Sequence, residues 1–177
     1  MSNIFIRHGE VENPKDIYYV NVPGYKLSKN GESQAEQVGI YLKDNGYNYN
    51  IITSPLLRAR QTGLIIAKIL GTEIKTHVAL YEWMGPIVWR GLRFDEIVKE
   101  NIPEVEEEHL DVYKRVKKID DQFNKTIFIS HQDTIRSFTY FMIDNLDVDF
   151  HKYKPSHCEV QSINYDKKII EQIFIPN

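Results

Sequence analysis

Two basic residues follow the first apolar run of the chain. The run "IFI" at residues 4–6 is succeeded at once by Arg7 and His8, and then by Gly9. A guanidinium binds anions through paired N–H donors, and an imidazole can act as a nucleophile or transfer a proton. We therefore take this position as a candidate site for chemistry on a charged ligand.

Two later apolar runs end on the same kinds of side chain. "YNIIT" at residues 49–53 is followed by Ser54 and then by Arg58, and "KTIFIS" at residues 125–130 is followed by His131. Together the three runs supply two arginines and two histidines. This set suits a compact, multiply charged anion, for which phosphate is the obvious candidate.

The three runs have the composition of buried strands. β-branched and aromatic residues pack well in a sheet, and continuous apolar runs are typical of parallel strands covered on both faces. Ligands of such sheets bind beyond the carboxyl ends of the strands, where all of these polar groups would stand. Further strands are expected at residues 72–78, 160–166 and 168–175, the last two joined by a tight turn at Asp166-Lys167.

Helical patterns separate the strands. Ser28 is a candidate N-cap for a helix that Gly46 ends, and Ser54-Pro55 is expected to start a helix that ends at Gly71. Other helices are expected over about residues 93–124, including the acidic run at 104–109, and over residues 133–145. The alternation predicts an α/β fold, a three-layer α/β/α sandwich with a mainly parallel central sheet, as a single domain over residues 1–177.

Composition excludes several classes of function. A net charge of −3 over 177 residues gives no global attraction to nucleic acid or to an anionic membrane. The single cysteine, Cys158, excludes an internal disulfide and suits a reducing compartment; we expect it to be a packing residue. No apolar run approaches the roughly 20 residues of a membrane span, and no signal peptide is apparent. We expect a cytoplasmic protein.

The ordered motifs resemble the histidine phosphatase superfamily, whose best-known members are the cofactor-dependent phosphoglycerate mutases. The resemblance rests on "RHGE", "LSKNGESQA", "SPLLRARQT", "LYEW" and "ISH", and it covers residues 4–141. It implies a phosphoglycerate mutase-like fold. The chain looks more like the small phosphomonoesterases of the family than like the mutases, which are generally longer.

The resemblance implies a role for each of the strand-end residues. His8 would attack phosphorus and form a phosphohistidine, which water then hydrolyses to inorganic phosphate. Arg7, Arg58 and His131 would hold the phosphoryl oxygens of a small phosphorylated substrate and stabilise charge in the transition state. No metal and no cofactor is expected.

The proton donor for the leaving oxygen has two candidates. Glu82 in "LYEW" matches the usual acid of the family, and burial near Trp83 would raise its pKa. The alternative is Asp133, because one branch of the family takes its donor directly after the second histidine. Asp133 stands one residue further along, where it also suits the dipole of a helix start. We expect Glu82 to be the donor.

The resemblance also implies secondary contacts and shows departures. Asn13 lies where relatives often carry an asparagine that contacts phosphate, and Gln132 is a further candidate substrate contact after His131. Gln132 and Asp133 replace a glycine pair that is frequent in the family. Val11 stands where many relatives have a hydroxyl residue, so one auxiliary contact is expected to be absent.

Two segments, residues 11–26 and 83–92, should overhang the strand ends and read the leaving group. They are rich in aromatic side chains, which would either contact the substrate or pin the loops to the body. These side chains are Tyr18, Tyr19, Tyr25, Trp83 and Trp89.

Other activities fit the sequence less well. A metalloenzyme is disfavoured because the histidines His8, His131, His151 and His157 are scattered and two arginines would repel a metal ion. A dinucleotide-dependent oxidoreductase lacks the glycine-rich fingerprint. Two alternatives stay open: a phosphoglycerate mutase-type phosphoryl transferase, and a catalytically silent relative that binds a phosphorylated ligand. The oligomeric state is not indicated.

Overall fold

The computed structural model describes residues 3–97, 103–143, 150 and 153–177. A six-stranded sheet with the order β3-β2-β4-β1-β5-β6 forms the centre of the molecule, and β5 runs antiparallel to both of its neighbours while β1, β2, β3 and β4 are parallel. The strands are β1 (Ile4–Arg7), β2 (Asn50–Thr53), β3 (Ile74–Thr76), β4 (Thr126–Ser130), β5 (Val160–Asn164) and β6 (Ile169–Phe174). The predicted mainly parallel sheet is thus confirmed.

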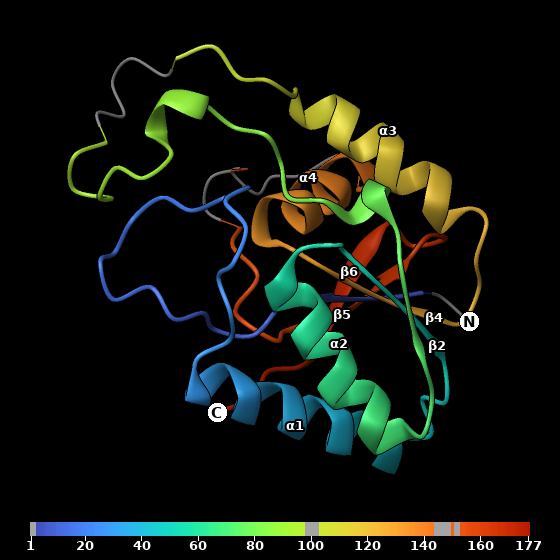
Figure 1. Cartoon of the computed structure of the whole chain (residues 1–177). Helices are drawn as coiled ribbons and strands as arrows, with labels where there is room; N and C mark the ends of the chain where they lie inside the picture. The colour runs from blue at the N-terminus through green and yellow to red at the C-terminus, as the bar shows by residue number, and fades with distance from the viewer. Residues whose placement is uncertain (1–2, 98–102, 144–149, 151–152) are drawn as a thin grey trace.

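Helices cover both faces of this sheet (Figure 1), as the predicted three-layer sandwich requires. Helices α1 (Lys29–Asp44) and α2 (Leu57–Leu70) lie on one face, and α3 (His109–Asp120) and α4 (Gln132–Met142) lie on the other. Two short 3₁₀ helices, η1 (Val78–Leu80) and η2 (Ile87–Trp89), lie in the connection between β3 and α3.

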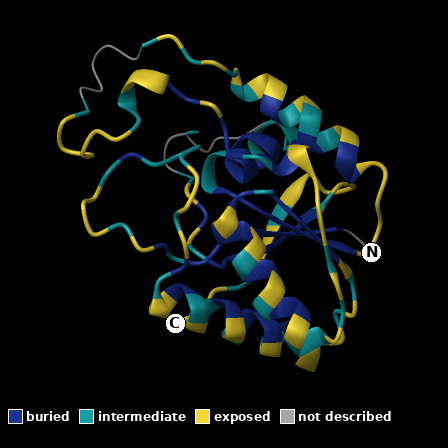
Figure 2. Ribbon diagram, viewed as in Figure 1, coloured by how far each residue is buried: buried dark blue, intermediate teal, exposed yellow. Residues whose placement is uncertain are grey.

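The alternation of side chains along the strands builds two cores. Ile4, Ile6 and Ile129 pack towards α1 and α2, whereas Phe5 and Phe128 pack towards α3 and α4. Figure 2 shows the central strands buried, whereas exposed residues lie on the edge strands β3 and β6, on the outer faces of the helices and in the loops. Burial on both faces explains why the strand runs are continuously apolar.

The start and end of α1 follow the sequence prediction. The Ser28 hydroxyl oxygen accepts a hydrogen bond from Gly31 N at 3.0 Å, which caps the helix. After the C-cap residue Asn45, Gly46 takes a φ of 74°, a left-handed conformation that favours glycine. A Cβ on Gly31 would meet the Glu10 carbonyl oxygen at 2.1 Å, so this helix start packs directly against the chain that follows β1.

The start of α2 differs from the prediction. The helix begins at Leu57, with Leu56 as N-cap, rather than at Ser54-Pro55. The Ser54 hydroxyl accepts a hydrogen bond from Leu56 N at 3.3 Å, so these residues form a turn before the helix. This turn leaves Ser54 at the end of β2, facing the residues that follow β4.

The acidic run is also not helical, contrary to the prediction. Residues 93–97 and 103–108 contain no helix, and α3 begins only at His109; residues 98–102 lie outside the described part of the chain. Glu106 N and Glu107 N both donate to Met84 O at 3.1 Å. The Glu107 carboxylate pairs with Arg115, 2.6 Å from Oε1 to Nε. These contacts tie the run to the loop after η1 instead of extending the helix.

Long loops gather at the carboxyl ends of the parallel strands. The loop after β1 and the segment around η2 lie on the same side of the molecule, at the left in Figure 1. They are joined by an isolated bridge between Ile17 and Arg93. At the other end of the sheet, the tight turn predicted at Asp166-Lys167 joins β5 to β6. Within the described residues, no helix has the length and apolar character needed to cross a membrane.

Candidate active site

His8 stands directly after β1 and is almost completely buried, 2% exposed. Its Nδ1 lies 2.7 Å from Gly9 O, and a carbonyl oxygen can only accept, so Nδ1 carries the proton. Nε2 therefore holds a lone pair, which accepts a hydrogen bond from Arg58 Nε at 3.1 Å. Burial, followed by the charge of Arg58, holds the pKa of His8 well below its usual value. His8 is thus a neutral imidazole that carries its lone pair on Nε2.

Arg7 lies beside His8 with its two terminal nitrogens occupied. Nη1 donates to Gln132 Oε1 and to Pro155 O, each at 2.8 Å, and Nη2 lies 2.8 Å from His157 Nε2. Among the described residues, the buried Nε of Arg7 has no hydrogen-bond partner. A buried N–H without a partner costs free energy, so this donor is a strong candidate to bind a ligand oxygen.

Arg58 is brought to the same place by the first turn of α2 and is 1% exposed. Its Nη2 donates to Val20 O at 2.6 Å, and its guanidinium lies over the ring of Tyr19, 5.0 Å from the centroid. The loop after β1 therefore closes over this arginine. The buried cation keeps His8 neutral and supplies positive charge for an anion.

His131 follows β4 and faces His8, with ring centroids 5.1 Å apart. Its Nε2 lies 2.8 Å from the Ser54 hydroxyl, which the turn before α2 places there. Its Nδ1 is buried and has no hydrogen-bond partner in the described part of the chain. Burial and the charges of Arg58 and Arg7 hold the pKa of His131 well below its usual value. When Ser54 donates to Nε2, Nδ1 is a second free donor beside His8.

Glu82 approaches the pair of histidines from the loop after η1 and is 5% exposed. Its Oε1 accepts a hydrogen bond from Trp83 N at 2.9 Å, whereas Oε2 lies 4.0 Å from His131 Nδ1. Burial, reinforced by the charge of Asp133, raises the pKa of Glu82 to about 7. Oε1 is thus bonded to the backbone, and Oε2 is the oxygen that lies towards His131.

Asp133, the alternative donor, lies in the first turn of α4. Its Oδ1 is 2.6 Å from Arg136 Nη2, so the two residues form an ion pair between positions three apart on the helix. The Asp133 carboxylate is therefore directed to Arg136 of its own helix, whereas the Glu82 carboxylate lies 4.0 Å from His131 Nδ1.

Three of the other predicted residues play local roles in the structure. Gln132 contacts Arg7 as described above. Asn13 is bound to the backbone of Ile17: its Nδ2 donates to Ile17 O at 2.9 Å and its Oδ1 accepts from Ile17 N at 3.2 Å. Val11 is buried and forms a bridge with Leu27. Asn13 therefore shapes the loop after β1 and is not brought among the strand-end residues by these contacts.

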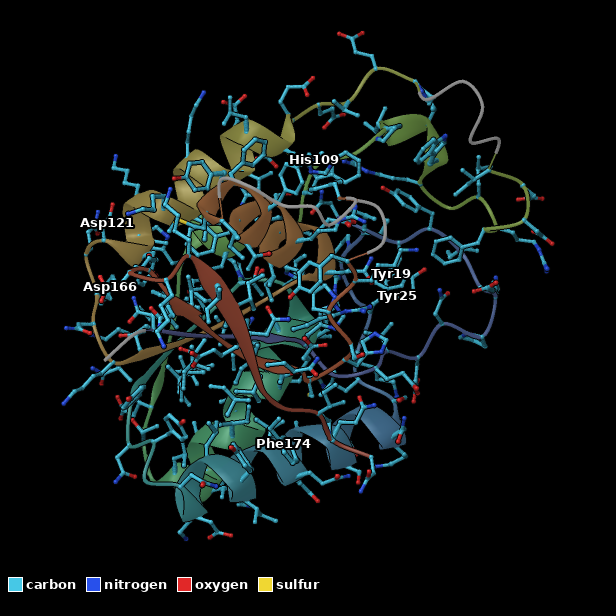
Figure 3. All side chains as sticks on the ribbon, turned by 180° about the vertical axis from the view of Figure 1, so that it is seen from behind. Tyr19, Tyr25, His109, Asp121, Asp166 and Phe174 are labelled. Atoms are coloured by element: carbon cyan, nitrogen blue, oxygen red, sulfur yellow. The ribbon has the colours of Figure 1, made fainter. Side chains whose placement is uncertain are left out.

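Most of the aromatic side chains of these two loop segments pack against other rings and so hold the loops in place. The Tyr18 ring packs edge-on against Trp89, with centroids 5.7 Å apart, and Trp83 stacks on His109 at 4.5 Å. Tyr19 and Tyr25 differ, because they stack on each other at 4.6 Å and Tyr19 covers Arg58. Figure 3 shows this pair side by side, at the end of the molecule that carries the site. It is the aromatic pair closest to the strand-end arginines.

The sequence analysis missed His157, which it counted among scattered histidines. Its ring centroid lies 5.8 Å from that of His8, so three of these imidazoles come together; His151 lies outside the described residues. β5 runs antiparallel to β1, so its amino end, which His157 precedes, reaches the edge where the parallel strands end. Each of the three rings uses Nε2 for a protein partner, namely Arg58, Ser54 or Arg7. Among the described residues, no cluster of three or more His, Cys, Asp or Glu is arranged to hold a metal ion.

Two histidines and two arginines thus meet at the carboxyl edge of the parallel sheet, an arrangement that suits a compact, multiply charged anion. The chain belongs to the histidine phosphatase superfamily (branch 1), whose sequence profile matches residues 3–172. This result confirms the resemblance found in the sequence motifs.

Curated relatives match part of the chain. An uncharacterized protein of Mycobacterium tuberculosis is 36% identical over 104 residues, which are 50% of this chain and 51% of that protein. The 2,3-bisphosphoglycerate-dependent phosphoglycerate mutase of Borreliella burgdorferi is 39% identical over 69 residues, 38% of this chain and 28% of the mutase. The chain therefore spans about half, or less, of the length of these relatives.

Solved structures match the whole fold. Phosphoserine phosphatase of Entamoeba histolytica, in complex with 3-phosphoglyceric acid, superposes with a TM-score of 0.78 at 20% identity, covering 100% of this chain and 98% of that one. Mycobacterial glucosyl-3-phosphoglycerate phosphatase with inorganic phosphate gives a TM-score of 0.72 at 15% identity, covering 97% and 95%. At these identities the likeness establishes a shared fold, and both proteins are phosphatases.

Proposed function

We propose that this protein is a metal-independent phosphomonoesterase that acts on a small phosphorylated metabolite through a phosphohistidine at His8. The observation that carries the proposal is the lone pair on His8 Nε2, held by the Nδ1–H bond to Gly9 O. Beside it lie two buried donors without partners among the described residues, Arg7 Nε and His131 Nδ1. A nucleophile with adjacent free donors suits attack on a phosphoryl group.

In the first step, Nε2 of His8 attacks phosphorus and the bond from phosphorus to the leaving oxygen breaks. Arg58 Nε, which contacts Nε2 in the free protein, then turns its donor to a phosphoryl oxygen. Glu82 Oε2 gives its proton to the leaving oxygen, so the alcohol departs neutral. The products of this step are phosphohistidine, the alcohol and the Glu82 carboxylate.

In the second step, the Glu82 carboxylate takes a proton from a water molecule. The resulting oxygen attacks phosphorus on the side opposite His8, and the N–P bond breaks. Inorganic phosphate leaves, His8 recovers its lone pair and Glu82 is protonated again. The raised pKa of Glu82, about 7, suits a group that must give and take a proton near neutrality.

The substrate is proposed to be small and phosphorylated, because the loop after β1 closes over Arg58 and restricts the site. We place the activity in a single domain over residues 1–177. The single buried cysteine and the modest net charge support a cytoplasmic protein that binds neither nucleic acid nor membranes.

Hydrolysis of an activated aryl phosphate, with a metal chelator present, tests the proposal. Turnover that resists the chelator is expected, followed by a screen of phosphorylated metabolites with poorer leaving groups. No turnover at acidic to neutral pH, with phosphate still bound, would instead favour a silent relative that binds a phosphorylated ligand.

A mutase-type phosphoryl transferase is the second candidate, favoured by the 39% identity to the Borreliella mutase. The two activities differ in what accepts the phosphoryl group from His8. Adding phosphoglycerate during turnover of a phosphorylated donor separates them. A phosphatase releases inorganic phosphate at an unchanged yield, whereas a mutase transfers the group to the added acceptor in preference to water.

A further inference from the structure

The segment that precedes β5 wraps around Arg7. Pro155 O accepts from Arg7 Nη1 at 2.8 Å, and His157 Nε2 contacts Arg7 Nη2 at the same distance. Cys158 N donates to the carbonyl oxygen of Arg7 at 3.0 Å. The segment therefore holds both the side chain and the backbone of one arginine, although the two lie about 150 positions apart in the sequence.

The backbone of this segment has an uncommon conformation at Cys158. Cys158 has a φ of 55°, in the left-handed region that non-glycine residues rarely adopt. Its side chain is fully buried, and burial raises the pKa of its thiol to about 12, so it is not a nucleophile. The left-handed conformation turns the chain at the residue after His157 and brings the imidazole to Arg7.

A second set of contacts supports the turn. Ser156 N donates to Glu159 Oε2 at 2.7 Å, and Glu159 N donates to Ser156 O at 3.1 Å. Glu159 is 3% exposed, and its Oε1 also accepts from Gln161 Nε2. The buried Glu159 carboxylate and the Glu159 backbone N–H thus both bond to the backbone of Ser156, which closes a turn around His157 and restricts where the imidazole can lie.

The contact between Arg7 and His157 determines the state of the imidazole. A guanidinium only donates hydrogen bonds, so His157 Nε2 must accept and the ring must be neutral. Burial, followed by the charge of Arg7, lowers the pKa of His157 to about 4, in agreement with this assignment. Because Nε2 is engaged by Arg7, His157 does not act on the phosphoryl group directly.

We infer that His157 is a positioning residue that orients Arg7 for the phosphoryl group. Its Nε2, with Gln132 Oε1 and Pro155 O, accepts from three of the five N–H donors of Arg7, and this leaves the buried Nε–H and the second N–H of Nη2 for the ligand. Without His157, the guanidinium is held through Nη1 alone, and Nη2 loses the acceptor that fixes its orientation. This inference rests on the proposed function, because it concerns the same anion site.

Three variants test the inference. His157→Leu removes the acceptor, whereas His157→Gln offers Oε1 near the position of Nε2. Ser156→Ala is the matched control, since the Ser156 side chain is exposed and the contacts of the residue are through its backbone. The measurements are binding of inorganic phosphate by calorimetry, kcat and KM for an aryl phosphate, and the thermal unfolding midpoint.

We expect His157→Leu to weaken phosphate binding and to lower kcat/KM by about 10- to 100-fold, as small displacements of a positioned group do. His157→Gln should recover most of this loss, and Ser156→Ala should match the wild type. In an Arg7→Ala background, His157→Leu should add no further loss of phosphate binding, because its effect passes through Arg7.

Three results would overturn the inference. They are equal phosphate binding in His157→Leu and Ser156→Ala, an additive loss in the Arg7→Ala background, and no recovery in a folded His157→Gln protein. Failure of the proposed function is distinguishable, because phosphate binding is measured without turnover. A wild-type protein that binds phosphate but does not hydrolyse the ester would refute the phosphatase proposal and leave the test of His157 intact.

Discussion

The two ends of the central sheet differ in how completely their buried polar groups are hydrogen-bonded. At the amino ends of the parallel strands, Asn3 Nδ2 donates to Asp120 Oδ1 at 2.8 Å, and the Tyr165 hydroxyl donates to Asp120 Oδ2 at 2.6 Å. Asn3 Oδ1 accepts from Thr126 N at 3.0 Å. In this network of Asn3, Asp120 and Tyr165, each buried side-chain polar atom has a partner, so its role is to join the sheet to α3 and the β5–β6 hairpin.

At the carboxyl ends, Arg7 Nε and His131 Nδ1 are buried without partners among the described residues. Figure 3 shows the contrast in position, with Asp121 and Asp166 at one end of the molecule and Tyr19 and Tyr25 at the other. A cavity of about 780 Å³ lies at the amino end, lined by Asn3, Asp120 and Tyr165 among others. The candidate site is therefore marked by unpartnered nitrogen atoms of an arginine and an imidazole next to His8, rather than by the size of a cavity.

The largest effect is expected from His8→Ala. Loss of the nucleophile should lower kcat for an aryl phosphate by at least about 10,000-fold, since the covalent route is then closed. A phosphate-release assay measures it, and thermal unfolding shows whether the variant folds. Turnover that survives the substitution in a metal-free sample would place the nucleophile elsewhere.

Glu82→Gln should have the next largest effect, and one that depends on the leaving group. Turnover of an alkyl phosphate should fall by about 100- to 10,000-fold, because the leaving oxygen then receives no proton. In kcat/KM, which reports formation of the phosphohistidine, an activated aryl phosphate needs little protonation and should lose far less, although the later hydrolysis step is slowed for both substrates. Equal losses on the two substrates would exclude Glu82 as the donor, and Asp133→Asn is the matched comparison.

The pKa of Glu82 also predicts how turnover depends on pH. Since the pKa of Glu82 is raised to about 7 and the protonated form is the donor, kcat/KM for an alkyl phosphate should fall as the pH rises through about 7. On the acid side, His8 stays neutral because its pKa is lowered, so no loss through His8 is expected between pH 7 and pH 6. A profile that rises through pH 7 would contradict this assignment.

Substitutions at the amino end should affect stability and leave turnover unchanged. Asp120→Ala leaves Asn3 Nδ2 and the Tyr165 hydroxyl with fewer partners and should lower the free energy of unfolding by about 1–3 kcal/mol. Urea denaturation measures the loss. A fall in kcat/KM at temperatures where the variant is fully folded would show that the two ends are coupled, and would break the comparison.

Tyr165→Phe should have the smallest effect of the set. It removes one hydrogen bond to Asp120 from a side chain that is 36% exposed, at a cost of about 0.5–1.5 kcal/mol. Its loss should be smaller than that of Asp120→Ala in the same denaturation experiment. A loss larger than that of Asp120→Ala would mean that the ring, not the network, stabilises the hairpin.

The residues that the parallel strands bring to the site were predicted well from the sequence. Arg7, His8 and His131 follow apolar strands, and parallel strands bring their carboxyl ends to one edge, so their proximity followed from a general rule. The catalytic roles of these residues are still predictions. His157 was missed because it precedes β5, and the antiparallel direction of that strand is not encoded in its local pattern.

Helix boundaries were predicted less well, for reasons visible in the contacts. Ser54-Pro55 has the composition of a helix start. The Ser54 hydroxyl is instead hydrogen-bonded to Leu56 N and to His131 Nε2, so α2 begins later. The acidic run at residues 104–109 has helical composition. However, the Glu107 carboxylate pairs with Arg115, and the backbone N–H groups of Glu106 and Glu107 donate to Met84 O. Tertiary contacts overrode local propensity at both positions.

The most direct test of the account is to trap the covalent intermediate. The wild-type protein is mixed with an activated aryl phosphate, quenched in base within one turnover and digested, and the peptides are analysed by mass spectrometry. The account predicts a phosphoryl group on His8, absent in His8→Ala and increased when Glu82→Gln slows hydrolysis of the intermediate. A phosphoryl group on another residue, or none during chelator-resistant turnover, would contradict the central claim that His8 is the nucleophile.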